Sequence, residues 1–404
     1  MKTLPAALLP LLVCAILACE KYSITRYYRS EVMDAVGAGG NPPGKQDPPD
    51  VDLYVSAVVV PDDYDWRRDT AYGAVESRLA FFRNGECLFS VPAGLGSDIS
   101  VKPSTHHIMN GHLYTECVSG GSTVIMEDGK EVLRYDGAEV LRGMIMRPGE
   151  IITLGKPLGA DGFCLRRNGE VRLRHATGAV YGDFSDYACG ATGALYDDNG
   201  EVCFCFRDDR YCYTVMDEET VQVRMSGSAT SVTDMRIVES GLYYILHYSR
   251  ATMVYGPWRT ISLSGSAQYS DLRIAGTDGS VLLFAETCDP EQTVVRDISE
   301  GIESERWTVF DGKGNFVYRA GGPFFAVSSP DGLLRIQKEG EGDIFLRDSS
   351  FFFGRACAVP SGDGIYLAVN PKERECLPYV WHSGKEDFFD FNGFLTGLAV
   401  SPPN

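Results

Sequence analysis

The chain has 404 residues, of which 44% are hydrophobic and 11% aromatic, and its formal net charge at pH 7 is −18. This hydrophobic content excludes a disordered chain, and the length allows either two or three ordinary domains or one large repeat array. The acidic balance, with no cluster of Lys and Arg to offset it, argues against binding to nucleic acid or to an acidic membrane surface.

The N-terminus contains the most specific motif. Lys2 precedes an apolar run from Leu4 to Ala18, which is placed like the hydrophobic region of a secretory signal peptide and is short for a membrane span. The run ends in Ile16-Leu17-Ala18-Cys19, which resembles the bacterial lipobox. The resemblance implies that residues 1–18 are removed and that Cys19 carries a diacylglyceryl anchor. The alternative is a plain signal peptide followed by an incidental cysteine.

Residues 19–50 are predicted to form a flexible tether. Glu20, rather than Asp, follows the cysteine, and in lipoproteins this favours export to the outer membrane. Segments 37–44 and 47–50 are rich in Gly and Pro and too poor in apolar residues to pack. We therefore expect one folded domain, residues 51–404, held at the bacterial cell envelope.

A sequence pattern typical of a β-hairpin recurs along this domain. Residues 122–137 show it best: two short alternating strands are joined by Asp128-Gly129, a pair that accepts the positive φ angles of a type I′ turn. Similar turns follow at Asn84-Gly85, Asn168-Gly169, Gly256-Pro257, Asp311-Gly312 and Ser383-Gly384. Each copy of this pattern predicts the outer two strands of a four-stranded antiparallel unit.

A second sequence pattern predicts the inner half of the unit. It consists of a strand, a Gly-containing turn and another strand. With the hairpin it gives a period of about 40 residues, as in propeller blades. Its copies begin near Ile108, Met144, Met235, Leu272, Phe325 and Cys357, with a weaker copy over 187–196.

The two ends of the domain predict closure of a ring. Asp52–Val60 looks like a second strand without its first, and Leu395–Pro402 looks like a first strand without its second. We predict an all-β fold: a single β-propeller of seven or eight four-stranded antiparallel blades, closed by strands from both termini. The number stays open because residues 324–350 form a short repeat. A pair of β-sandwiches is the rival fold, but it does not explain the incomplete ends.

Ten cysteines follow Cys19, without a CxxC pair or a zinc-site spacing. Most occur in alternating apolar runs such as Val202-Cys203-Phe204-Cys205-Phe206. We expect them to be small buried hydrophobic residues rather than structural disulfides.

Long polar and aromatic connections are candidates for ligand binding, because such loops on a rigid frame commonly carry binding sites. Three stretches stand out, at 61–72, 181–187 and 287–307. The candidate ligand-binding residues in them are Asp63, Tyr64, Trp66, Arg67, Arg68, Tyr72, Tyr181, Asp183, Tyr187 and Arg296. The alternative is that the aromatic residues pack on their own blade and the charged residues form solvated ion pairs.

No catalytic or metal site is predicted. Neighbouring carboxylates such as Asp62 and Asp63 point to opposite faces of a strand, which does not suit a hydrolytic pair. His106, His107 and His112 form the one histidine cluster of the sequence, and a hydrogen-bonded packed pair explains it better than metal ligation. We expect no cofactor.

The chain resembles surface lipoproteins of Bacteroidetes in its lipobox, its tether and its blades, which lack the signature of a known propeller repeat. The genes of such lipoproteins often lie near glycan-uptake genes. Our first hypothesis is a lipid-anchored, non-catalytic binding or scaffold propeller that uses its long loops to hold a glycan or a partner protein. The alternative is a carbohydrate-active hydrolase or lyase with its site in the propeller funnel. A third hypothesis is a purely structural part of an outer-membrane complex.

Overall fold

The computed structural model describes residues 51–68, 72–94, 106–182, 192–223, 231–238, 241–249, 251–263, 269–277, 280–299, 307–319, 322–329, 333–351, 353, 355–362 and 364–401. The predicted signal peptide (1–18), the predicted lipidated Cys19 and the predicted tether (19–50) lie outside these ranges. The described residues belong to one compact unit, Val51–Asn404.

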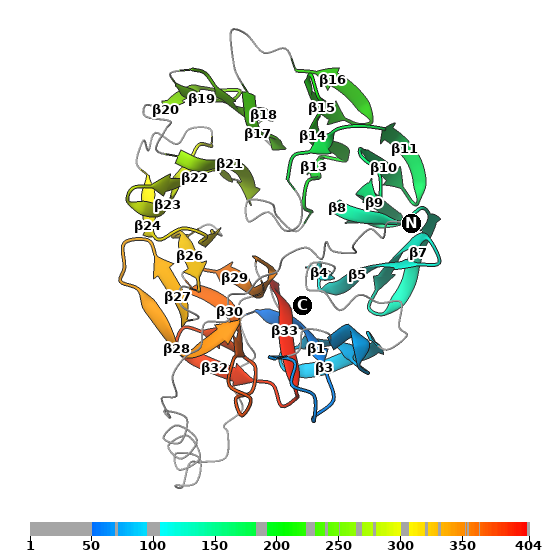
Figure 1. Cartoon of the computed structure of the whole chain (residues 1–404), viewed down its shortest axis with the longest axis vertical. Coiled ribbons are helices and arrows are strands. Elements are labelled where there is room, and N and C mark those ends of the chain that lie inside the picture. Colours follow the sequence, from blue (N-terminus) through cyan, green and yellow to red (C-terminus); the bar gives the residue numbers. More distant parts are fainter. Residues whose placement is uncertain are drawn as a thin grey trace, which may run out of the picture. The chain divides into compact units, whose positions relative to one another are not determined.

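This unit is an all-β propeller of eight four-stranded antiparallel blades arranged in a ring (Figure 1). The prediction of seven or eight blades is thereby confirmed and narrowed to eight. Within the described ranges, the helical turns are η1 (Tyr72–Ala74) and η5 (Arg355–Cys357). Blade 1 contains both ends of the unit, because β33 near the C-terminus pairs along the whole of β1, as predicted.

The strands of each blade follow one another from the inner to the outer edge. Blades 1 to 4 consist of β33 (Gly393–Ser401), β1 (Asp52–Val59), β2 (Arg78–Arg83) and β3 (Glu86–Pro92); β4 (His106–Met109), β5 (His112–Ser119), β6 (Ser122–Glu127) and β7 (Lys130–Asp136); β8 (Glu139–Arg147), β9 (Glu150–Pro157), β10 (Phe163–Arg167) and β11 (Glu170–His175); and β12 (Ala179–Val180) with β13 (Tyr196–Asp198), β14 (Glu201–Arg207), β15 (Cys212–Met216) and β16 (Glu219–Gln222).

Blades 5 to 8 have the same order. They consist of β17 (Ser231–Val238), β18 (Gly241–His247), β19 (Thr252–Tyr255) and β20 (Thr260–Leu263); β21 (Tyr269–Thr277), β22 (Ser280–Cys288), β23 (Glu291–Asp297) and β24 (Thr308–Asp311); β25 (Phe316–Tyr318), β26 (Phe325–Ser328), β27 (Leu333–Lys338) and β28 (Ile344–Phe351); and β29 (Ala358–Ser361), β30 (Gly364–Pro371), β31 (Tyr379–His382) and β32 (Lys385–Phe388).

Two irregular blades explain the uncertain repeats of the sequence. In blade 4 the inner position is divided between β12 and β13, which pair with opposite ends of β14, so the sequence pattern of one inner strand is interrupted. In blade 7 the short repeat is a genuine blade, but its first strand is β25. The run from Phe325, which we expected to be a first strand, is therefore the second strand.

The prediction of one long connection over residues 287–307 was also wrong. Its first part forms a tight turn at Asp289-Pro290, and residues 291–297 then form β23, which pairs with β22 and β24. Connections between first and second strands, and between third and fourth strands, define the hairpin rim of the ring. Connections between second and third strands, and between blades, define the opposite loop rim.

Three of the predicted Asn/Asp-Gly turns bond back to the second strand of their own blade, whereas Asp311-Gly312 lies at the end of β24, the fourth strand of blade 6, and leads to blade 7. Asn84, Asp128 and Asn168 adopt positive φ angles of 50°, 49° and 48°, which Asn and Asp tolerate better than most residues. The Oδ1 atom of Asn84 accepts a hydrogen bond from the backbone N–H of Leu53 at 2.8 Å. Asp128 and Asn168 accept equivalent bonds from Leu113 and Ile151. Each turn thus satisfies backbone groups that the hairpin would otherwise leave without a partner.

A separate apolar cluster fills each of the eight interfaces between neighbouring blades. Strands in the interior of a blade, such as the second strand, therefore bury side chains on both faces. In β14, Val202 and Phe204 pack toward blade 3, whereas Cys203 and Cys205 pack toward blade 5. Six of the nine described cysteines are buried and all nine are free thiols, in agreement with the prediction of small hydrophobic residues.

Candidate binding surface on the loop rim

The connection between β1 and β2 folds into a compact loop on the loop rim. The backbone N–H of Tyr64 donates to the carbonyl of Pro61 at 3.0 Å, and that of Arg68 donates to the carbonyl of Asp65 at 3.1 Å. Asn392, on the connection from blade 8 to blade 1, donates through Nδ2 to the carbonyls of Pro61 and Tyr64 at 2.6 and 2.8 Å. One side-chain amide therefore fixes the start of the loop.

Trp66 anchors the loop to the core. Its side chain is only 4% exposed, and its ring lies 4.9 Å from Phe394, 5.6 Å from Phe351 and 6.5 Å from Phe353, measured between ring centroids. Such aromatic packing is a large contribution to stability. The indole therefore holds the loop in place and does not offer an exposed face on which a sugar could stack.

Arg67 joins this loop to blade 8. Its guanidinium carbon lies 4.5 Å from the centroid of the Trp66 ring, Nε donates to the carbonyl of Pro371 at 2.9 Å, and Nη2 donates to the carbonyl of Cys376 at 3.0 Å. Burial lowers the pKa of the Arg67 guanidinium. The side chain is a planar clamp between two connections of the loop rim.

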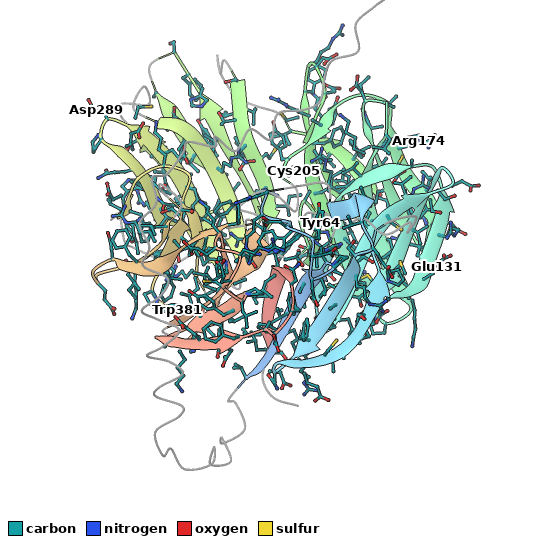
Figure 2. The ribbon with its side chains drawn as sticks, turned by 60° about the horizontal axis from the view of Figure 1, so that its bottom comes forward. Tyr64, Glu131, Arg174, Cys205, Asp289 and Trp381 are labelled. Carbon is teal, nitrogen blue, oxygen red and sulfur yellow. The ribbon has the colours of Figure 1, made fainter. Side chains whose placement is uncertain are left out.

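The exposed residues above these anchors form what we call the rim surface: Asp62, Asp63, Arg68 and residues 372–375. The side chain of Arg68 is 89% exposed, and Arg374 donates through Nη2 to the carbonyl of Asp63 at 3.4 Å. Tyr64 is half-buried beside them and lies inward of Glu131 and Arg174, which belong to the outer strands β7 and β11 (Figure 2). The rim surface is thus a rigid patch with acidic and basic groups interspersed.

The remaining predicted residues are not part of this patch. Tyr181 lies at the interface of blades 4 and 5, where its hydroxyl contacts the Cys212 thiol at 3.5 Å and burial raises its pKa. Arg296 lies inside β23 of blade 6 and is 8% exposed. The backbone of Tyr72 forms part of η1, and its side chain lies outside the described residues, as do Asp183 and Tyr187.

Sequence reasoning missed a buried polar cluster between blades 2 and 3. The guanidinium of Arg166 bonds Glu139 at 2.9 Å and lies 4.4 Å from the Tyr135 ring, while Glu116 accepts a bond from the backbone N–H of Leu141 at 3.0 Å. Burial raises the pKa of Glu116 to about 7. The signal available in the sequence was the charged residue in the otherwise alternating apolar run of β5.

Among the described residues, one group of three His, Cys, Asp or Glu side chains brings ligand atoms within 4.8 Å of one another: His112, Glu127 and Asp128. The other two histidines of the predicted cluster lie in β4 and are not part of this group. Desolvation and the neighbouring His106 lower the pKa of His107 to about 3. The described part of the chain contains no helix that is long and apolar enough to cross a membrane.

The fold places the chain in the class of eight-bladed β-propellers. No protein-family model matches it, and its sequence matches no curated protein. The solved structure of the dihydro-heme d1 dehydrogenase NirN in complex with DHE is similar, with a TM-score of 0.52 at 12% identity, over 90% of this chain and 78% of that chain.

More distant likenesses involve parts of larger proteins. Dipeptidyl peptidase 4 of Porphyromonas gingivalis gives a TM-score of 0.42 at 13% identity, over 74% of this chain and 53% of that chain. A prolyl endopeptidase gives a TM-score of 0.41 at 10% identity, over 76% and 51%. At 12% identity, the similarity to NirN shows a shared fold and nothing about the ligand.

Proposed function

We propose that this protein is a lipid-anchored, non-catalytic binding propeller of the bacterial cell envelope, similar to surface lipoproteins of Bacteroidetes and held at the outer membrane through Cys19. The observation that carries the proposal is the rim surface: an exposed patch of mixed charge on loops that Trp66, Arg67 and Asn392 hold rigidly. Rigid loops lose little conformational entropy on binding, which favours recognition of a partner.

A protein partner is the ligand class that the surface favours first. Asp62, Asp63 and Arg68 present both signs of charge, which suits a complementary protein surface. A glycan is the second candidate, because carboxylates and guanidinium groups bind sugar hydroxyls. The burial of Trp66 removes the largest stacking surface that a sugar site would have used.

The test compares a variant of the rim surface with a variant on the exposed outer edge of blade 3. Asp62→Ala, Asp63→Ala and Arg68→Ala are combined in one variant, and Glu170→Ala with Arg172→Ala on the outer strand β11 of blade 3 is the matched control. Crosslinking in the membrane fraction and a glycan array give the readouts. We expect a crosslinked protein partner that the triple variant loses and the control keeps. Equal capture by both variants would contradict the proposal, and glycan binding lost in the triple variant would assign the surface to sugars.

The anchor needs its own measurement. Cys19→Ser should abolish labelling by a radioactive fatty acid and move the protein from the membrane fraction to the soluble fraction. Unchanged membrane retention without labelling would contradict lipid anchoring while leaving the rim surface untouched.

An enzyme is the alternative, since NirN, a dehydrogenase, shares the architecture. A screen for new reducing ends or unsaturated products on envelope polysaccharides tests the hydrolase or lyase form. Product formation that persists in the rim variant would place a catalytic site elsewhere in the propeller.

A further inference from the structure

Blades 1 and 3 contain the same charged arrangement at the hairpin rim. The residue that opens the second strand is an acid, Asp52 in blade 1 and Glu150 in blade 3. It forms an ion pair with an arginine at the end of the third strand, Arg83 in blade 1 and Arg167 in blade 3, where the Nη1–Oε1 distance is 2.9 Å. An Asn follows each arginine and begins the turn. The negative charge is compensated in both blades.

In blade 2 the residues at all three of these positions are different. His112 opens the second strand, Glu127 ends the third strand in place of the arginine, and Asp128 begins the turn in place of the Asn. The Nδ1 atom of His112 lies 2.7 Å from Oδ2 of Asp128 and 3.5 Å from Oε1 of Glu127. Two carboxylates therefore occupy a position where the neighbouring blades have one carboxylate and a guanidinium.

The two carboxylates of this group are held by the surrounding blade. Oδ1 of Asp128 accepts a bond from the backbone N–H of Leu113 at 3.0 Å, so this carboxylate keeps its orientation and directs Oδ2 toward the imidazole. The hydroxyl of Tyr114, a residue only 4% exposed, hydrogen-bonds Glu127. The side chain of His112 is 47% exposed, which gives an ion access from solvent. The group is therefore preorganised and open on one side.

We propose that His112, Glu127 and Asp128 bind a divalent transition-metal ion, with Zn²⁺ as the probe. One imidazole nitrogen and two carboxylate oxygens are a donor set that Zn²⁺ accepts. The ion would supply the positive charge that arginine supplies in blades 1 and 3. Three protein ligands leave a coordination position for water or for a donor atom from a partner. The sequence pattern did not predict this metal site, because it grouped His112 with His106 and His107 rather than with the turn carboxylates.

The decisive variant is Asp128→Asn. Asn occupies the same turn position at Asn84 and Asn168, so the variant keeps the positive φ angle and the bond to Leu113 while it removes a charged ligand. Asp217→Asn in blade 4 is the matched control, since Asp217 also has a positive φ of 43° in the turn after its third strand and pairs with Arg167.

Isothermal titration of the metal-free full chain with Zn²⁺ should show one site per chain. Asp128→Asn, Glu127→Gln and His112→Asn should each weaken the affinity at least tenfold, while Asp217→Asn should leave it unchanged. Substitution with Co²⁺ should give a visible absorption band that the same three variants lose.

Two outcomes would overturn the proposal. One is the absence of stoichiometric Zn²⁺ binding, which would make the group a hydrogen-bonded turn. The other is binding that survives in the three variants but disappears in Cys87→Ser with Cys288→Ser, because these two exposed thiols are the competing soft ligands. Equal melting temperatures of Asp128→Asn and the unaltered protein without metal would show that a loss of affinity does not come from unfolding.

Discussion

Between blades 8 and 1 the buried surface is largely apolar, with eleven buried residues in its cluster, including Leu53, Val380 and Leu395. Between blades 2 and 3 the apolar cluster has five buried residues, and the remaining space contains Glu116, Glu139 and Arg166. The two interfaces join the same kinds of strand in the same ring. Their difference shows that a blade interface can be filled by hydrocarbon or by a hydrogen-bonded polar network.

One pair of residues occupies equivalent positions in the two interfaces. Asn370 on β30 and Glu116 on β5 both lie on the second strand of a blade and both bond an inner-strand leucine 25 residues further along the chain. Asn370 bonds both backbone groups of Leu395, through Oδ1 at 2.7 Å and through Nδ2 at 3.0 Å. Glu116 accepts a bond from the N–H of Leu141. An amide both donates and accepts, whereas an ionised carboxylate only accepts.

This chemical difference makes one interface sensitive to pH. Burial raises the pKa of Glu116 to about 7 in the folded protein, above the value of about 4.3 expected for an unfolded chain. The folded state therefore binds the proton more tightly than the unfolded state. The contribution of Glu116 to the free energy of unfolding is present at low pH and is lost as the pH rises through about 7. Asn370 has no such dependence.

The largest effect is expected at the buried ion pair. Arg166→Met leaves the 2%-exposed Glu139 carboxylate without its cationic partner, and we expect a loss of about 3–5 kcal/mol in the free energy of unfolding. Urea denaturation at pH 7.5 measures it. Adding Glu139→Gln to this variant should recover most of the loss. If the double variant is as unstable as the single one, the packing of the arginine, and not its charge, holds the interface.

Asn370→Ala should cost about 2–4 kcal/mol, because it leaves the N–H and the carbonyl of buried Leu395 without this partner. Asn370→Asp transfers the chemistry of Glu116 to the apolar interface. We expect its melting temperature to fall as the pH is raised from 5 to 8, more steeply than that of the unaltered protein. Parallel pH profiles for the two proteins would contradict this expectation.

Glu116→Gln tests the other direction of the exchange. The neutral amide avoids burial of a charge, so the variant should be more stable than the unaltered protein at pH 8 by about 3 kcal/mol and nearly equal to it at pH 4.5. Calorimetry at several pH values checks the expectation. A constant difference across that range would show that Glu116 does not titrate within it.

The smallest effect is expected for an ion pair at the hairpin rim. Arg147 bonds Asp197 across blades 3 and 4 at 2.7 Å, but the Asp197 side chain is 36% exposed. We expect Arg147→Met to cost at most about 1 kcal/mol, because water and salt screen such pairs. The cost should disappear in 1 M NaCl, whereas that of Arg166→Met should persist. A persistent cost for Arg147→Met would indicate that its aliphatic packing matters more.

Local chemistry determined the repeat. Alternating apolar residues and the Asn/Asp-Gly turns specify a strand, a turn and a partner strand within about 15 residues, and both features are visible in the sequence. The incomplete strands at Asp52 and Leu395 predicted the closure, which β1 and β33 make as expected. The prediction of the propeller rested on these short-range signals.

Contacts between distant parts of the chain determine which polar residues are exposed. Trp66 and Arg67 share the composition of a binding loop, yet contacts with Phe394 and Pro371, about 300 residues away, bury the indole and clamp the guanidinium. Pairing of β23 with both neighbours likewise buries Arg296. The blades could be predicted from the sequence because strand and turn chemistry acts between near neighbours. The assignment of Glu116, Asn370 and the rim residues to core or surface depended on the packing of blade against blade, a contact that forms only when the ring is assembled.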